Sequence, residues 1–149
     1  MAVNWFPKGY QQVIPYLAVQ GAGRIIPFAE KTLGAKVIEK HEGPGGRLMH
    51  AEIRIGECVV MLGEPEEERK GGTAMLMVYL PDVDDAYRRA LAAGGTKERE
   101  PADQFYGDRT AGVKDPCGNL WYLATHIKDV SKEEMAAHMA ESVKKSAKK

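Results

Sequence analysis

The feature that most limits the fold of this chain is a weak internal repeat with a period of 61 residues. Tyr16-Leu17-Ala18-Val19 aligns with Met77-Val78-Tyr79-Leu80, and both segments are apolar and strand-like. Each is followed by a stretch of helical periodicity that ends at glycine, Gly34 in the first copy and Gly94 in the second. The two halves of the chain are therefore expected to share one order of elements.

The segments after each helix extend the match. Residues 46–53 align with 107–114, and residues 58–62 align with 119–123. Each half reads as strand, helix and three strands, which predicts an α+β fold of two βαβββ modules at about residues 10–64 and 72–127. One such module is too small to bury its own sheet, so the two must pair, within a chain or between two chains. Helices on one side would leave the opposite sheet face to line a cleft.

Composition excludes several classes of partner. Lys and Arg together number 21, as do Asp and Glu, so the chain has no basic field and nucleic acid is not an expected partner. No apolar run has transmembrane length and residues 1–10 lack a signal-peptide pattern, so no membrane association is expected. Cys58 and Cys117 form no CxxC pair, which favours free thiols and a cytoplasmic location.

Several segments resemble the glyoxalase/bleomycin-resistance/dioxygenase superfamily, whose fold is called vicinal oxygen chelate. The resemblance covers roughly residues 12–135 and places a family-like domain at residues 1–130. It is carried by residues 15–19 with Leu33-Gly34-Ala35, by 46–56, by 104–109, by 115–121 and by 123–126. It implies that the two modules form a cupped mixed sheet with a ligand cleft.

The resemblance also implies where a divalent metal would lie. Family enzymes usually use four ligands drawn from His, Gln and Glu, two from each half. Matching strand to strand puts these positions at Ile14, Met61, Met75 and Tyr122, and none of these side chains suits a hard or borderline cation. We therefore expect no metal and no cofactor at the centre of the cleft.

Strand alternation predicts which side chains face the cleft. Between Leu48 and Ile55 the apolar residues alternate with His50, Glu52 and Arg54, which are assigned to the cleft. The same parity in the second half assigns Arg109, Ala111 and Val113 to the cleft. The remaining strands supply the other predicted ligand-binding residues: Tyr16, Met61, Met75, Met77, Tyr79 and Tyr122.

Three functions are compatible with this inventory. The first is a binding protein of the bleomycin-resistance kind, which holds a small organic molecule in a metal-free apolar cleft with Arg109 as its anchor for an anionic group. The second is an enzyme, such as a lyase, an isomerase or a dioxygenase-like enzyme, with His50 and Glu52 as acid and base. The third uses His50, Glu52 and His126 as a shifted metal site. Each residue also has a plain structural reading, such as an ion pair or core filling.

The last segment, residues 131–149, is predicted to form a helix followed by a lysine-rich tail. Ser131 and Glu134 form a capping box, and Met135, Met139 and Val143 make a thin apolar stripe. The stripe is expected to dock on the domain or on a second subunit. Together with zero net charge it favours a homodimer.

Overall fold

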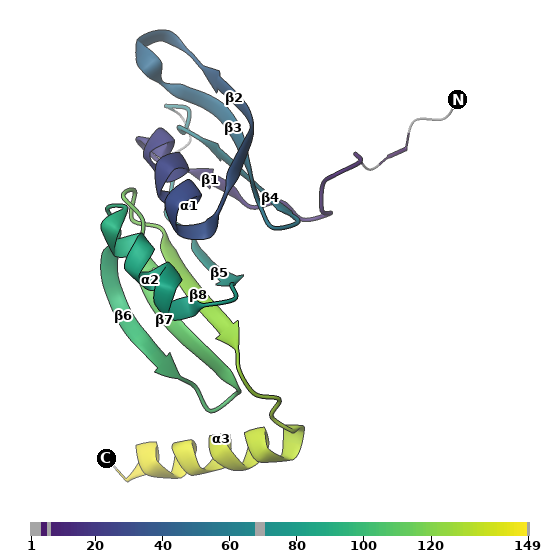
Figure 1. Cartoon of the computed structure of the whole chain (residues 1–149), viewed down its shortest axis with the longest axis vertical. Coiled ribbons are helices and arrows are strands. Elements are labelled where there is room, and N and C mark those ends of the chain that lie inside the picture. The colour runs from purple at the N-terminus through teal and green to yellow at the C-terminus, as the bar shows by residue number, and fades with distance from the viewer. Residues whose placement is uncertain (1–3, 6, 68–70, 149) are drawn as a thin grey trace.

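The computed structural model describes residues 4–5, 7–67 and 71–148; the first residues of the predicted domain and Lys149 of the predicted tail lie outside this range. The first half contains β1 (Tyr16–Ala18), η1 (Ala22–Arg24), α1 (Ile25–Leu33), β2 (Lys36–Glu42), η2 (Pro44–Gly46), β3 (Leu48–Ile55) and β4 (Cys58–Gly63). The second half contains β5 (Met75–Tyr79), α2 (Val83–Ala92), β6 (Thr96–Asp103), β7 (Asp108–Lys114) and β8 (Leu120–His126), and α3 (Lys132–Ala147) follows (Figure 1). The predicted order of strand, helix and three strands is confirmed in both halves.

Each half forms its own four-stranded mixed sheet. The strand orders are β1-β4-β3-β2 and β5-β8-β7-β6, and in each sheet only the first pair is parallel. The two parallel pairs are equivalent, because Tyr16 lies opposite Met61 in one and Met77 lies opposite Tyr122 in the other. The α+β class and the repeated topology are as predicted, and the two sheets remain open rather than closing into a barrel.

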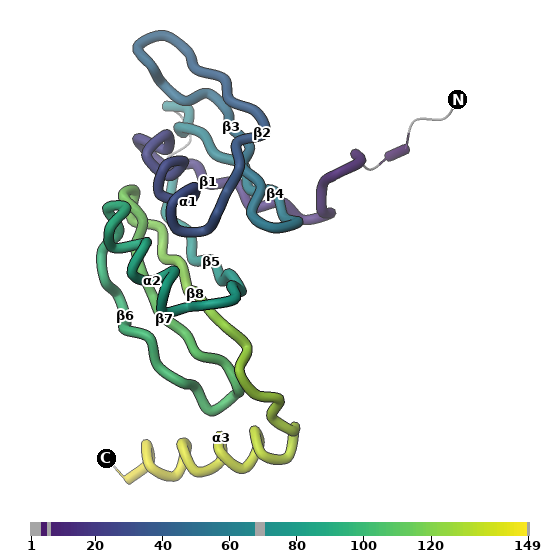
Figure 2. The backbone as a smooth tube through the Cα atoms, viewed as in Figure 1, coloured from purple at the N-terminus to yellow at the C-terminus, as the bar shows by residue number. Residues whose placement is uncertain are grey.

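The helices form because their apolar residues recur on one side. In α1 the buried residues include Ile25, Phe28 and Leu33, and Gly34 ends the helix with φ of 65°, a left-handed conformation that favours glycine. Helix α2 begins at Asp82, whose side chain accepts a hydrogen bond from the Asp85 amide. The two helices pack against each other, on the same side of both sheets (Figures 1 and 2).

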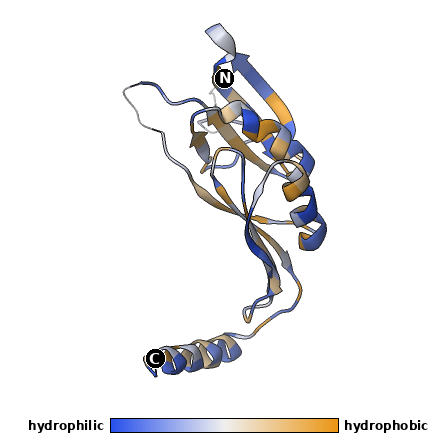
Figure 3. Cartoon of the chain, turned by 90° about the vertical axis from the view of Figure 1, so that its left-hand side faces the viewer, coloured by the Kyte–Doolittle hydropathy of each residue, from blue (hydrophilic) through white to orange (hydrophobic). Residues whose placement is uncertain are grey.

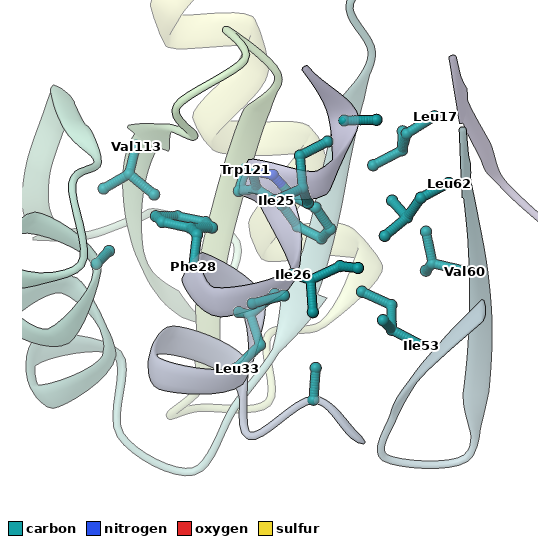
Figure 4. Close-up of a cluster of buried hydrophobic side chains, with 14 of the residues drawn as sticks. Leu17, Ile25, Ile26, Phe28, Leu33, Ile53, Val60, Leu62, Val113 and Trp121 are labelled. Atoms are coloured by element: carbon teal, nitrogen blue, oxygen red, sulfur yellow. The ribbon is translucent and has the colours of Figure 1, made fainter. Parts of the chain in front are cut away.

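One hydrophobic core joins the two halves. Phe28 of α1 lies beside Val113 and Trp121 of the second sheet, and Leu17 and Leu62 continue the cluster into the first sheet (Figure 4). Contact between the halves is close at one glycine, because a Cβ atom added to Gly95 would come within 2.9 Å of the Phe28 ring. The two βαβββ units therefore share a single interior within one chain.

The register of β7 differs from the prediction. Eight residues separate Glu52 from its partner Met61, whereas nine separate Gly112 from its partner Tyr122. A shift of one residue turns every side chain of a strand to the opposite face. The predicted cleft-side assignment is therefore wrong for three residues of β7, which lie on the helix side: Arg109, Ala111 and Val113.

The surface of the two sheets that faces away from α1 and α2 is named the open face here. From the first sheet it presents Tyr16, His50, Glu52 and Met61, and from the second sheet it presents Met75, Met77, Tyr79, Arg99, Asp108, Thr110, Tyr122 and His126. The predicted orientation of His50 and Glu52, opposite to that of Ile53, is confirmed by the strand pairing.

Helix α3 stands apart from the sheets (Figures 1 and 3). The predicted capping box is confirmed, with Ser131 and Glu134 each accepting a backbone hydrogen bond from the other. None of the residues from Lys132 to Ala147 is buried, and the helix contacts the domain where the His138 ring stacks on the Phe105 ring, with centroids 4.2 Å apart. Of the predicted stripe, Met135 is partly buried, whereas Met139 and Val143 are exposed and do not dock on the domain. Across the described part of the chain, no helix is long and apolar enough to span a membrane.

Candidate functional site on the open face

The second sheet exposes an apolar strip along β5. Strand alternation puts three large apolar side chains of β5 on the open face. All three are exposed: Met75 by 70%, Met77 by 49% and Tyr79 by 61%. Tyr122 lies beside Met77 on the neighbouring strand, and its ring crosses Gly112, where an added Cβ atom would lie 3.2 Å from the ring. A larger residue at position 112 would require the Tyr122 ring to move by a few tenths of an ångström. Four of the predicted ligand-binding residues, Met75, Met77, Tyr79 and Tyr122, are thus brought together, and their role as ligand contacts stays a prediction.

A guanidinium group borders this strip, but it belongs to Arg99 rather than Arg109. Arg99 lies opposite Gly112 in the β6–β7 pair, so its side chain shares the face of Tyr122. Its guanidinium carbon lies 5.4 Å from the centre of the Tyr122 ring, and it donates a hydrogen bond of 2.9 Å to the Thr110 hydroxyl. Among the ion pairs of the described residues none involves Arg99, so its charge has no carboxylate partner there. Arg99 was not among the predicted residues, because it lies in a run of alternating charges with no apolar pattern to assign its face.

Arg109 is held by carboxylates of its own chain. Its guanidinium donates two hydrogen bonds to Asp84 of α2, at 2.8 and 2.9 Å, and a third to Asp103 at 2.9 Å. The hydrogen bonds from Asp84 and then Asp103 raise the pKa of Arg109, and the same contact lowers the pKa of Asp84. Asp84 and Asp103 thus occupy the donors of Arg109 that were predicted to hold an anionic ligand, which favours a structural role for this residue.

An Asp–His pair lies at the far end of the second sheet. The Asp108 carboxylate, which is buried, accepts hydrogen bonds from Tyr79 at 2.7 Å and from His126 at 2.7 Å. Burial opposes ionisation of Asp108, but the bonds from His126 and Tyr79 outweigh it and lower its pKa. Hydrogen bonds to Asp129 and Asp108 raise the pKa of His126, and the bond to Asp108 raises the pKa of Tyr79. His126 is thereby engaged within its own half and does not join His50 and Glu52.

The first sheet carries a second polar group on the open face. His50 bonds through Nε2 to Oε1 of Glu52 at 3.1 Å and through Nδ1 to the Tyr16 hydroxyl at 3.1 Å. Tyr10 donates to Oε2 of Glu52 at 2.6 Å. This bond is the main cause that lowers the pKa of the Glu52 carboxyl, with His50 adding to it and burial opposing it, and it raises the pKa of Tyr10. Whether His50 and Glu52 act as acid and base stays a prediction.

A groove of about 730 Å³ runs along the free edge of β5. Its walls are mostly apolar and come from both halves, including Val13, Val59, Met77, Tyr79 and Leu80. The volume lies within the range of ordinary small-molecule pockets. Of the predicted ligand-binding residues, Met77 and Tyr79 line this groove, whereas Tyr16 lines a separate hollow with Met49 and Arg47.

The four positions that the resemblance assigns to a metal do not suit one. Met61 and Tyr122 lie on the open face of their sheets, Met75 is exposed at the start of β5, and Ile14 precedes β1. An isoleucine has no donor atom, a methionine sulfur is soft, and a neutral tyrosine is a poor ligand. The residues present do not fit the metal of the family enzymes, so no chemistry of the protein is derived through it.

The segment after β7, on which much of the resemblance depends, has a structural role. The buried Asp115 carboxylate accepts hydrogen bonds from the Trp121 indole at 2.9 Å and the Asn119 side chain at 2.9 Å. The Asn119 side-chain oxygen in turn accepts a bond from the Ala74 amide at the start of β5. These bonds satisfy buried polar groups and fix the β7–β8 connection against the core.

Comparison with known proteins places this geometry among related folds. The model of the Glyoxalase/Bleomycin resistance protein/Dioxygenase superfamily matches residues 11–123. Uncharacterized proteins of Mycobacterium bovis and Mycobacterium tuberculosis are 33% identical over 151 residues, which cover 94% of this chain and 97% and 86% of those proteins.

Solved structures agree in fold. TioX from Micromonospora sp. ML1 has a TM-score of 0.64 and 25% identity, over 78% of this chain and 99% of TioX. A glyoxalase/bleomycin resistance protein/dioxygenase family enzyme from Burkholderia phytofirmans PsJN has a TM-score of 0.61 and 19% identity, over 77% of this chain and 96% of that one.

Proposed function

This chain belongs to the glyoxalase/bleomycin resistance protein/dioxygenase superfamily, and we propose that it binds a small organic acid on its open face without a metal at the family's central positions. The ligand has an apolar or aromatic body, which contacts Met77 and Tyr79, and an anionic group, which pairs with Arg99. Binding or sequestration of this ligand, rather than a reaction on it, needs only groups that the open face provides. The protein acts as a homodimer, in which the second copy helps to cover the open face.

The observation that carries this proposal is the guanidinium of Arg99 beside an uncovered apolar strip. Apolar side chains as large as Met75, Met77 and Tyr79 rarely lie uncovered side by side on a surface with no partner. A planar guanidinium presents several donors in the geometry of a carboxylate, and here only the Thr110 hydroxyl and the Tyr122 ring occupy it among the described residues. An amphipathic acid can cover the apolar strip with its body and pair with the Arg99 guanidinium through its carboxylate.

The test is a thermal-shift screen of small aromatic and aliphatic carboxylates, each paired with its neutral amide, in buffer with excess EDTA. A ligand at a hundred times its Kd adds about 2.7 kcal/mol to the free energy of unfolding, which gives a clear rise in Tm. At least one carboxylate is expected to raise Tm more than its amide does. If no acid raises Tm, the proposal is wrong.

Arg99→Ala then separates the anchor from the apolar strip. Loss of one charged hydrogen bond is expected to weaken binding of the acid about tenfold or more and to leave binding of the amide unchanged. Arg88→Ala is the matched control, because Arg88 is an exposed arginine of α2 paired with Asp85. Equal affinity of the acid for wild type and Arg99→Ala would exclude Arg99 as the anchor.

A further inference from the structure

Three potential ligands for a cation meet on the first sheet. Glu39, His50 and Glu52 each offer an atom, and these atoms all lie within 4.8 Å of one another. They come from β2 and β3, whereas the metal positions implied by the family lie at Ile14, Met61, Met75 and Tyr122. These three residues therefore form a potential metal site that is distinct from the metal positions of the family.

A β-bulge brings Glu39 into this group. Val37 lies opposite Ile53 and Glu39 lies opposite Glu52, so Ile38 is an extra residue in β2. In an unbroken ladder Ile38 would lie opposite Glu52, and Glu39 would lie opposite Ala51, which is buried on the helix side. The bulge thus turns a carboxylate, in place of an isoleucine, toward His50 and Glu52.

Two carboxylates directly opposite each other in a sheet repel, and here one of them is 5% exposed. Among the described residues no lysine or arginine forms an ion pair with Glu39 or Glu52; Glu39 pairs with His41 and Glu52 pairs with His50. A divalent cation between the carboxylates would remove the repulsion more completely than a histidine can.

The hydrogen bonds around His50 and Glu52 leave one possible metal-binding atom of each residue facing the other. Tyr10 occupies Oε2 of Glu52, and Tyr16 bonds to Nδ1 of His50, so Oε1 of Glu52 and Nε2 of His50 remain on the inside, 3.1 Å apart. With metal–ligand distances near 2.1 Å, two ligands of a tetrahedral zinc ion lie about 3.4 Å apart. A tyrosine bonded to the outer nitrogen of a metal-binding histidine fixes its tautomer and ring orientation.

From these contacts we infer that Glu39, His50 and Glu52 form a site for a divalent first-row transition metal ion such as Zn²⁺. One imidazole nitrogen and two carboxylate oxygens are ligands that suit zinc better than magnesium or calcium, which prefer oxygen alone. A tetrahedral zinc ion held by these three residues would have one further position for water or another ligand. The inference does not depend on the proposed organic ligand, since the site forms within β2 and β3 of one chain.

The test is calorimetric titration of the full-length protein, stripped with EDTA and then freed of it, with ZnCl₂ and no organic ligand present. One Zn²⁺ per chain is expected to bind in the micromolar range or more tightly. His50→Ala and Glu39→Gln are expected to abolish this binding. Tyr16→Phe, which removes only the hydroxyl that orients His50, is expected to weaken it about tenfold.

His126→Asn is the matched control, because His126 is also an open-face histidine bonded to a buried carboxylate. It is expected to bind Zn²⁺ as wild type does. Glu39→Gln changes an exposed residue of an edge strand, so it keeps the test valid if His50→Ala fails to fold. Absence of Zn²⁺ binding to wild type, a preference for Mg²⁺ over Zn²⁺, or loss of binding only in His126→Asn would each overturn the inference.

Discussion

Arg99 and Arg109 lie on opposite faces of the same sheet, and their surroundings give them different roles. Arg109 is 33% exposed and is held by Asp84 and Asp103, whereas Arg99 touches a hydroxyl and an aromatic ring. A bidentate pair between a strand and a helix holds α2 on the sheet, while a guanidinium without a carboxylate is available to a ligand. At the scale of single residues, the candidate site depends on which of the two arginines has no carboxylate partner among the described residues.

Arg109→Ala should lower Tm by a few degrees and leave ligand affinity unchanged, because it removes both hydrogen bonds to Asp84. Arg88→Ala is the control, since its pair with Asp85 joins two exposed side chains of one helix and should change Tm little. Thermal unfolding of both variants and of wild type measures this. A weaker affinity for ligand in Arg109→Ala with unchanged Tm would contradict the structural role.

The pair of Asp108 and His126 predicts how stability depends on pH. The pKa of His126 is raised above its ordinary value of 6.5, so the contribution of its charged form is fully present below that pH. This contribution is lost as pH rises through the raised pKa of the folded state. The free energy of unfolding in urea should therefore fall as pH increases above about 6.5. His126→Asn should flatten this slope, and parallel slopes in the two proteins would show that the pair does not contribute.

At the scale of elements, the repeat and the periodicities predicted most of the fold. Apolar alternation in residues 48–55 assigned His50 and Glu52 correctly to the face opposite Ile53. The same reasoning failed for Arg109, because the longer connection between β7 and β8 shifts the register by one residue and no local pattern reports that shift. Glu39 and Arg99 were missed for a related reason, since bulges in β2 and β6 change the parity of the residues that follow.

The contacts of the polar groups could not be predicted from one sequence. Tyr10 and Glu52 are 42 residues apart, and the partner of Arg109 lies in a helix 25 residues away. Such contacts depend on how the two sheets and helices are arranged, not on local spacing. The segment around Asp115 resembles the family well, but the resemblance did not reveal its contacts. Its side chains form the buried hydrogen bonds of the β7–β8 connection.

Helix α3 contacts the domain where His138 stacks on Phe105, but none of its residues from Lys132 to Ala147 is buried. A chain ending at Val130 should therefore unfold with Tm within about 2 °C of that of the full chain. Thermal unfolding at equal concentrations of the two proteins tests this. A fall of many degrees would show that α3 docks on the domain or on a partner subunit in solution.

At the scale of the whole molecule, one shared core holds two open sheets side by side. Phe28 from the first half packs against residues of the second, so the halves are fixed relative to each other while the open face remains uncovered. This arrangement favours both a ligand and a second copy of the chain on that face. The proposed organic ligand lies along β5 of the second half, and the proposed cation lies on β2 and β3 of the first.

The homodimer proposal is tested by light scattering at micromolar concentration. Wild type is expected to have the mass of a dimer, and Met75→Glu is expected to be a monomer because it places a charge on the apolar strip that the second copy is proposed to cover. Met139→Glu makes the same change on exposed α3 and should stay dimeric. A monomeric wild type would refute the dimer, and dissociation only in Met139→Glu would place the interface on α3.

The organic ligand is proposed to lie on the open face along β5, and titration of labelled methionines tests this placement. The chain has seven methionines, and their labelled methyl groups can be followed one by one by NMR during titration with the carboxylate that raises Tm most. Met77 and Met75 should shift in proportion to bound ligand, while Met135 and Met139 of α3 should not. Shifts confined to α3, or none at all despite a rise in Tm, would contradict the account.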